Sequence, residues 1–106
     1  MVEVLQGSDL TIFIFPTLDG KTPSGVTSST YVLMTKSGGQ VVLTKNLSNG
    51  VSYANGRLAI TLSEVDTVSL EPGEYIQECV ARTTDGQDFF PLRNELIKVI
   101  KTTARI

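Results

Sequence analysis

The stretch "VDTVSLEPGEYIQECVAR", residues 65–82, decides the fold of this chain. Pro72 fixes φ for the second position of a type II turn, and Gly73 supplies the positive φ that the third position needs. A run of β-forming residues begins at Tyr75, directly after this turn. The stretch therefore predicts a sharp corner that leads into a strand.

Tyr75 occupies a position where such a corner carries a structural tyrosine. In immunoglobulin-like sandwiches, a tyrosine just past the corner sends its hydroxyl back to the backbone a few residues upstream. We expect Tyr75 to do this, with Leu70 packed under the turn. The alternation along residues 76–80 leaves open which face of the strand is the core.

Short β-rich runs separated by turn signals extend along the whole chain. Asn-Gly and Asp-Gly pairs favour tight hairpin turns because both residues tolerate positive φ. The expected strands cover residues 9–16, 30–36, 40–45, 56–62, 73–82, 88–92 and 95–101. One helical turn is expected over residues 62–67, where Ser63 and Asp66 have the spacing of a capping box. The pattern predicts an all-β, immunoglobulin-like antiparallel sandwich of about seven to eight strands, as a single domain over residues 1–106.

Charge and hydropathy argue against two classes of partner. The 106 residues carry a net charge of −2, with a pI near 5.0, and lack the basic stripe of nucleic-acid-binding domains. The longest apolar run, residues 12–15, is far shorter than the roughly 20 residues of a membrane-spanning helix. We therefore expect no nucleic acid and no membrane among the partners.

The residue types that most catalytic sites need are missing. The chain has no histidine, which removes the commonest general base and the commonest metal ligand. A Ser-His-Asp or Cys-His arrangement therefore cannot form within it. Cys79, the single cysteine, lies in a strand-like run and is interpreted as a packing residue. A single cysteine cannot form an internal disulfide, which fits a protein made in a reducing compartment. We expect no enzymatic activity, no cofactor and no metal site.

Opposite charges gather in different parts of the chain. Residues 1–92 hold five Lys or Arg against ten Asp or Glu, whereas residues 93–106 hold four against one. Five of the acids lie between positions 64 and 78. A run of acids is usually a solvated face, and the alternative is an electrostatic contact with a partner. Pairing of the acidic 64–78 segment with the basic tail, head to tail in a ring, is one such contact.

The strands expected at 9–16 and 95–101 carry apolar side chains on both faces. A half-exposed antiparallel strand should alternate apolar and polar residues, so the second face must be covered. Either the chain's own loops cover it or another subunit does. The candidate interface residues are Phe13, Phe15, Ile97, Val99, Lys98 and Lys101.

Four segments in order carry a family resemblance: "LQGSDLTIFIF", "LDGKTPSGVTSSTYVLMTK", "NGRLAITLSEVDTVSLEPGEYIQECVARTTDGQ" and "FFPLRNELIKVIK". The chain resembles the immunoglobulin-like β-sandwich domains of tailed-phage virion proteins, in particular the N-terminal domains of upper baseplate proteins. The matching residues are Gly7 and Asp9, then Asp19, Gly20 and Pro23, then Leu62, Thr67, Leu70, Pro72, Gly73 and Tyr75, and finally Asp85 and Gly86. Gln77 departs from the family, which often has an apolar or aromatic residue there.

The resemblance implies a non-enzymatic structural or adaptor protein of a phage or prophage particle, in the tail or baseplate. Such a protein acts by protein–protein assembly, as a homo-oligomer or with other virion proteins. It is made in the bacterial cytoplasm and resides in the virion when an active phage expresses it. The alternative is a small sandwich that binds a glycan or a protein ligand through the loop at residues 19–30, the longest loop expected.

Overall fold

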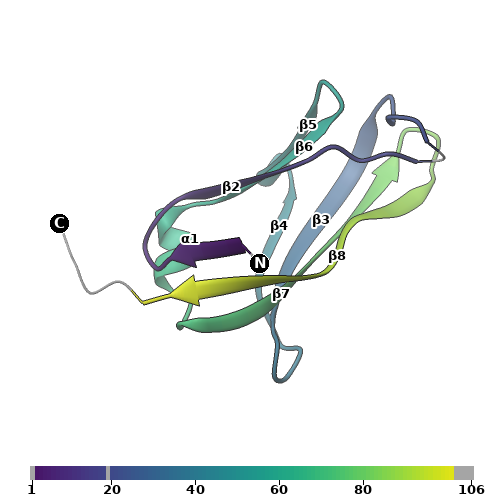
Figure 1. The fold of residues 1–106 in the computed structure, drawn as a ribbon. Coiled ribbons are helices and arrows are strands. Elements are labelled where there is room, and N and C mark those ends of the chain that lie inside the picture. The colour runs from purple at the N-terminus through teal and green to yellow at the C-terminus, as the bar shows by residue number, and fades with distance from the viewer. Residues whose placement is uncertain (1, 19, 102–106) are drawn as a thin grey trace.

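The fold is an immunoglobulin-like β sandwich. A computed structural model describes residues 2–18 and 20–101. Its elements are β1 (Val2–Leu5), β2 (Leu10–Ile14), β3 (Val26–Thr35), β4 (Val41–Leu47), β5 (Gly50–Ala54), β6 (Arg57–Leu62), α1 (Glu64–Val68), β7 (Gly73–Thr83) and β8 (Asp88–Ile100). The strands follow one hydrogen-bonded order, β1-β8-β7-β3-β4-β5-β6-β2. The sheet folds over between β4 and β5, where two residue pairs join the layers (Figure 1).

Most neighbouring strands run antiparallel, and the exceptions are the parallel pairs β1–β8 and β4–β5. The order β3-β7-β8 in one layer is that of strands C, F and G of an immunoglobulin sandwich. The predicted fold class is therefore confirmed. Among the described residues, no helix is long and apolar enough to cross a membrane.

Two short strands were missed by the sequence analysis, and two expected strands proved to be one. β1 and β5, of four and five residues, lie in stretches where no strand was expected. β8 joins the runs at 88–92 and 95–101. Its register against β7 shifts between them, where Gln77 pairs with Glu95 and Cys79 pairs with Leu92. Asn94 has a positive φ of 54° there, which is typical of a β-bulge.

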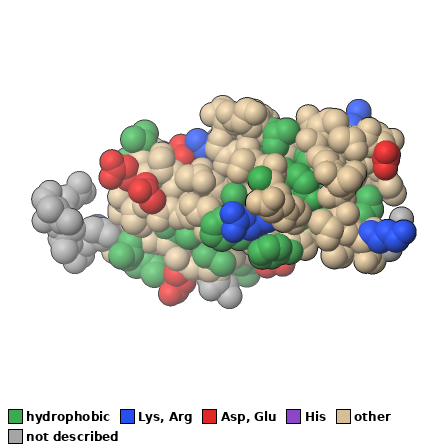
Figure 2. Space-filling model, turned by 90° about the horizontal axis from the view of Figure 1, so that it is seen from above, with side chains coloured by type: hydrophobic (Ala, Val, Ile, Leu, Met, Phe, Trp, Pro, Cys, Tyr) green, Lys and Arg blue, Asp and Glu red, His purple; other side chains and the backbone are tan. Residues whose placement is uncertain are grey.

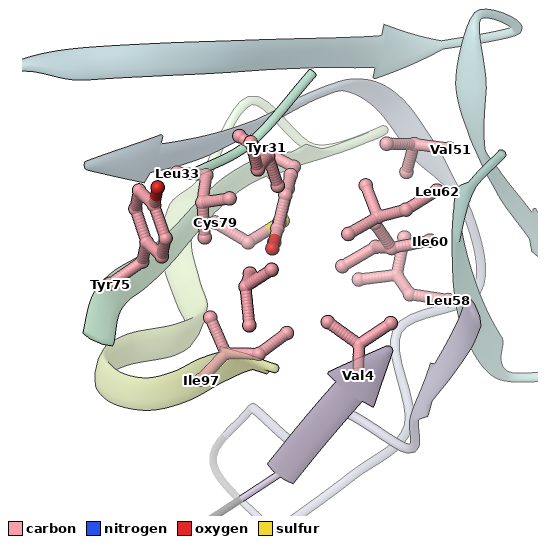
Figure 3. Close-up of a cluster of buried hydrophobic side chains, with 12 residues drawn as sticks. Val4, Tyr31, Leu33, Val51, Leu58, Ile60, Leu62, Tyr75, Cys79 and Ile97 are labelled. Atoms are coloured by element: carbon pink, nitrogen blue, oxygen red, sulfur yellow. The ribbon is translucent and has the colours of Figure 1, made fainter. Parts of the chain in front are cut away.

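The core lies between the two layers (Figure 3). The inward faces of both layers supply it, because side chains alternate along each strand. Its buried residues are Val4, Tyr31, Leu33, Val51, Leu58, Ile60, Leu62, Leu70, Tyr75, Cys79, Ile97 and Val99. The question left open for residues 76–80 is thereby answered, since Gln77 and Cys79 face the core with Tyr75.

The corner at residues 70–75 is built around Tyr75. Its hydroxyl donates to the carbonyl oxygen of Glu71 at 2.6 Å, and both Tyr75 and Leu70 are buried. This is the expected tyrosine corner. Gly73 has the expected positive φ, but its value of 151° is far from the roughly +80° of a type II turn. The expected turn type is therefore wrong, while the need for glycine is confirmed.

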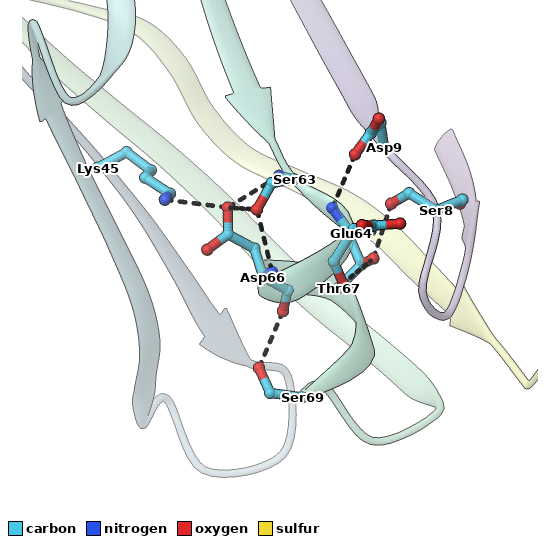
Figure 4. A network of polar contacts seen from close by, with 8 residues as sticks. All are labelled: Ser8, Asp9, Lys45, Ser63, Glu64, Asp66, Thr67 and Ser69. Carbon is cyan, nitrogen blue, oxygen red and sulfur yellow. Dashed lines mark hydrogen bonds and ion pairs between the residues drawn. The ribbon is translucent and has the colours of Figure 1, made fainter.

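α1 begins at a capping box, as predicted. The Ser63 hydroxyl accepts from the Asp66 backbone N–H at 3.3 Å, and the Asp66 carboxylate accepts from the Ser63 backbone N–H at 2.8 Å. The β1–β2 turn is attached to this helix: the Thr67 hydroxyl donates to the Ser8 carbonyl, and Asp9 accepts from the Glu64 N–H (Figure 4). These contacts fix the entry of the chain into β2.

A polar pair lies inside the core. The Tyr31 hydroxyl donates to the Gln77 side-chain oxygen at 2.7 Å, and both residues are buried. In antibody domains these places hold a strand-C tryptophan and the second cysteine of the inter-sheet disulfide, two residues after the corner tyrosine. The hydrogen bond satisfies an amide oxygen that would be costly to bury alone.

Candidate interaction surfaces

The described residues contain no group of three or more His, Cys, Asp or Glu side chains placed to hold a metal ion. Cys79 is buried, with its sulfur 3.4 Å from the Ser29 hydroxyl. Burial raises the pKa of the Cys79 thiol, although the hydrogen bond with Ser29 works in the opposite direction. The reactive thiolate is therefore disfavoured. Cys79 therefore packs in the core as a structural residue.

The acidic segment at residues 64–78 does not form one surface. Glu64, Glu71 and Glu74 are exposed, and Glu74 lies 3.4 Å from the Lys36 amine. Asp66 instead caps α1 and pairs with the Lys45 amine at 2.9 Å. Burial alone would raise the pKa of Asp66, but hydrogen bonds from Ser63 and Lys45 outweigh it and lower the pKa. Asp66 therefore has a structural role.

Phe13 and Phe15 are among the most exposed apolar side chains. Phe13 is 52% exposed and Phe15 is 71% exposed. The Arg57 guanidinium lies over the Phe13 ring, 4.4 Å from its centroid, which is a cation–π geometry. On the face drawn in Figure 2, hydrophobic side chains gather around a basic one. Both phenylalanines are thus exposed, and their predicted role in an interface stays a prediction.

Ile97 and Val99 cannot contact another chain, so this part of the predicted interface is wrong. Both are buried in the core, because they point inward from a strand that has β1 on one side and β7 on the other. The opposite face of β8 holds Lys98, which is exposed. Lys101, just past the end of β8, is exposed as well. The ring pairing of the acidic segment with the basic tail stays a prediction, and Arg105 lies outside the described residues.

A second apolar surface was missed, and we call it the outer face. It lies on the side of the β4-β3-β7-β8 layer that points away from the core. Side chains at positions 32, 34, 76 and 80 alternate with buried ones on β3 and β7, and the register places position 34 beside 76. Val41 and Phe90 extend the surface, at 51% and 55% exposed. The outer face consists of Val32, Met34, Val41, Ile76, Val80 and Phe90.

The outer face is shallow and carries little charge. A hollow of about 170 Å³ lies on it, lined by Thr30, Val32, Glu78, Cys79, Val80 and Phe90. Glu78 is half-buried near its middle. At its edge the Arg93 guanidinium lies 5.0 Å from the centroid of the Phe90 ring. One acid and one base on an apolar surface can fix the orientation of a partner.

The segment at residues 19–30 is shorter as a loop than expected, because β3 already begins at Val26. Together with the β7–β8 hairpin it borders an open pocket of about 450 Å³. The lining residues are Leu18, Lys21, Thr22, Pro23, Ser24, Thr83, Asp85 and Gln87. Asp19 lies outside the described residues. The pocket is the feature of the structure that bears on a ligand-binding role.

No family model matches this chain, and no curated protein matches its sequence. Among solved structures, one titled "Structure or murine CRIg" is similar to it, with a TM-score of 0.48 and 13% sequence identity. The similarity covers 96% of this chain and 92% of that chain. A likeness of this size says nothing about function.

Proposed function

We propose that this chain is a non-enzymatic structural or adaptor protein that acts by protein–protein assembly, in the tail or baseplate of a phage or prophage particle. The outer face is the observation that supports assembly. Monomeric proteins rarely leave a contiguous apolar patch of more than a few hundred Å² exposed, and here Val41 and Phe90 are each more than half exposed. The place in a phage particle is supported by the sequence resemblance alone.

The outer face has the chemistry of an interface core. Aromatic and aliphatic side chains supply the buried area, and few charges have to be desolvated. Glu78 and Arg93 would set the orientation of the partner, and Lys98 and Lys101 would add long-range attraction to an acidic surface. Bringing the outer face against a neighbour requires no change in the backbone, since its strands are held in the sandwich.

The native mass of the purified protein over a range of protein and salt concentrations tests this proposal. We expect an oligomer that Val41→Ser together with Phe90→Ser weakens at least tenfold, because this removes the two most exposed members of the outer face. Lys98→Glu with Lys101→Glu should weaken it in a way that high salt masks. Val65→Ser is the control, since Val65 is 71% exposed on α1 and lies on neither the outer face nor β2. A strict monomer at every concentration, or equal effects of the pair and the control, would contradict assembly through this face.

The pocket beside residues 20–25 favours a second candidate function, a module that binds a glycan or a protein ligand. Lys21, Thr22 and Gln87 give it hydrogen-bonding groups, and its volume of about 450 Å³ is within the usual range of ligand sites. Titration of the protein with cell-wall and surface glycans tests this function. Saturable binding that Gln87→Ala weakens would support it, and no heat or spectral change with any glycan would contradict a glycan-binding role.

A further inference from the structure

The sandwich is open along β2. In the described chain β2 is the last strand of the sheet order and has β6 as its ladder partner. Leu62, Ile60 and Leu58 of β6 are fully buried. Their register partners on β2, which also point inward, are only half-buried; they are Leu10, Ile12 and Ile14. The core therefore lacks cover at this edge.

The free edge of β2 carries few of the usual protections. Exposed edges are normally blunted by shortness, by charged side chains or by proline within the strand. β1, at the other end of the sheet order, is four residues long and includes the exposed Glu3. β2 itself has no charged residue, and Pro16 comes after the strand has ended. The charges near it are Asp9, directly before the strand, and Arg57 of β6, which lies over the Phe13 ring. β2 is thus the edge of this fold that is suited to accept another strand.

We propose that β2 pairs antiparallel with β2 of a second copy of the chain, about a twofold axis that passes beside Ile12. This register uses the whole five-residue strand. It places Leu10 opposite Ile14 and Ile12 opposite itself on the inner side, and Thr11 opposite Phe13 on the outer side. Every inner pair is apolar, the outer pair joins an aromatic and a β-branched residue, and no like charges meet. The second copy is the occupant because the strand is complementary to itself.

Strand pairing would continue the β5-β6-β2 layer across the dimer and cover the half-buried inner side chains of β2. The inference goes beyond the proposed function, because it uses an edge and not the outer face. A five-residue ladder with two added phenylalanine rings per subunit gives an interface at or below the small end of specific interfaces, which bury about 1,200 Å² or more. We therefore expect a weak dimer that dissociates on dilution.

Sedimentation equilibrium on matched variants tests the pairing. Thr11→Glu with Phe13→Glu places carboxylates opposite one another across the twofold axis. Thr61→Glu with Ala59→Glu puts the same charges at the register partners of those residues, on the same side of the layer but one strand further from the edge. We expect the first pair to weaken the dimer at least tenfold and the second to change it less than twofold. A monomeric wild type, or equal effects of the two pairs, would overturn the inference.

Cross-linking separates this dimer from assembly through the outer face. Ile12→Cys lies on the twofold axis, and a short bis-maleimide should join two copies through it. Ser52→Cys, exposed on β5 and away from both β2 and the outer face, and the wild type with its buried Cys79 serve as controls. We expect a cross-linked dimer with Ile12→Cys alone, and its yield should not change when Val41→Ser and Phe90→Ser are added. Loss of the cross-link in that background, or no cross-link in a protein that sediments as a dimer, would contradict the pairing at β2.

Discussion

At the scale of single residues, Tyr31 and Gln77 are the least expected part of the core. A hydrogen bond of 2.7 Å joins them where an immunoglobulin domain would have an apolar contact with a disulfide. A buried pair of this kind contributes modestly when complete and costs much more when half of it is removed. The two residues should therefore behave as a unit.

Replacing one member of this pair should destabilise the fold more than replacing both. Tyr31→Phe leaves the Gln77 amide oxygen without its donor and should lower the free energy of unfolding by about 1–3 kcal/mol. Gln77→Leu should have a similar effect, because it leaves the Tyr31 hydroxyl without an acceptor. The double variant leaves neither group unpaired and should therefore lose less free energy of unfolding than either single variant. Urea unfolding of the four proteins measures this, and additive losses would show that the two side chains do not act together.

At the scale of elements, the corner before β7 depends on the backbone of Gly73. Its φ of 151° lies in a region that other residues rarely adopt, yet nothing within 4 Å would meet an added Cβ atom. Any cost of a side chain there is therefore backbone strain and not a steric clash. Tyr75, two residues on, bonds to Glu71 across this corner.

Gly73→Ala should therefore lower the free energy of unfolding by about 1–3 kcal/mol. Gly38→Ala is the matched control, since Gly38 does not have a positive φ and an added Cβ would meet Thr35 only at an ordinary contact distance. We expect that change to be neutral or slightly stabilising, because alanine restricts the unfolded chain. Thermal melts of the two variants test this. Equal melting temperatures would mean that the corner relaxes without cost.

Local signals predicted the sandwich, the corner and the cap of α1, since Pro72, Gly73, Ser63 and Asp66 act through neighbours close in sequence. β1 was missed because four residues make too short a pattern and its partner β8 lies at the other end of the chain. The same long-range pairing buries Ile97 and Val99, so alternation alone could not show that they belong to the core.

The candidate surfaces were predictable only in part. Alternation in β2 placed Phe13 and Phe15 on the opposite side of the strand from Ile12 and Ile14, but it did not show which side faces the core. The outer face was not found because Gln77, a polar residue, faces inward while Ile76 and Val80 face outward. Polarity therefore gave no indication of which side of β7 is buried. Only the register with β3 and the Tyr31 hydrogen bond determine it.

At the scale of the whole molecule, titratable groups with shifted pKa values limit stability at both ends of the pH range. Burial raises the pKa of Tyr31, with a smaller contribution from Cys79. Burial also raises the pKa of Tyr75, and Glu71 adds to it. The pKa of the Cys79 thiol is raised as well, whereas the pKa of Asp66 is lowered. In alkali the unfolded chain therefore loses protons before the folded one does.

The free energy of unfolding should thus fall as the pH rises above about 8.5, where an unfolded cysteine ionises, and more steeply above about 10, where unfolded tyrosines do. Asp66 acts at the acid end of the pH range. Its contribution to the free energy of unfolding is present above about pH 4 and is lost as the pH falls below that value. Melting temperatures from pH 3 to pH 11 test this. Tyr31→Phe should have a shallower decline above pH 10, and an unchanged slope would contradict the assignment to Tyr31.

The parallel pairing of β1 with β8 also determines how the fold responds to mechanical force. The two strands lie side by side and point the same way, with Val2 beside Ile97 and Leu5 beside Ile100 (Figure 1). Tension applied at the opposite ends of the chain would pull these strands along their length in opposite directions. The hydrogen bonds between them would then be loaded in shear at the same time, and they could not break one after another. A small sandwich whose first and last strands are paired in this way is suited to bearing tension applied between its two ends.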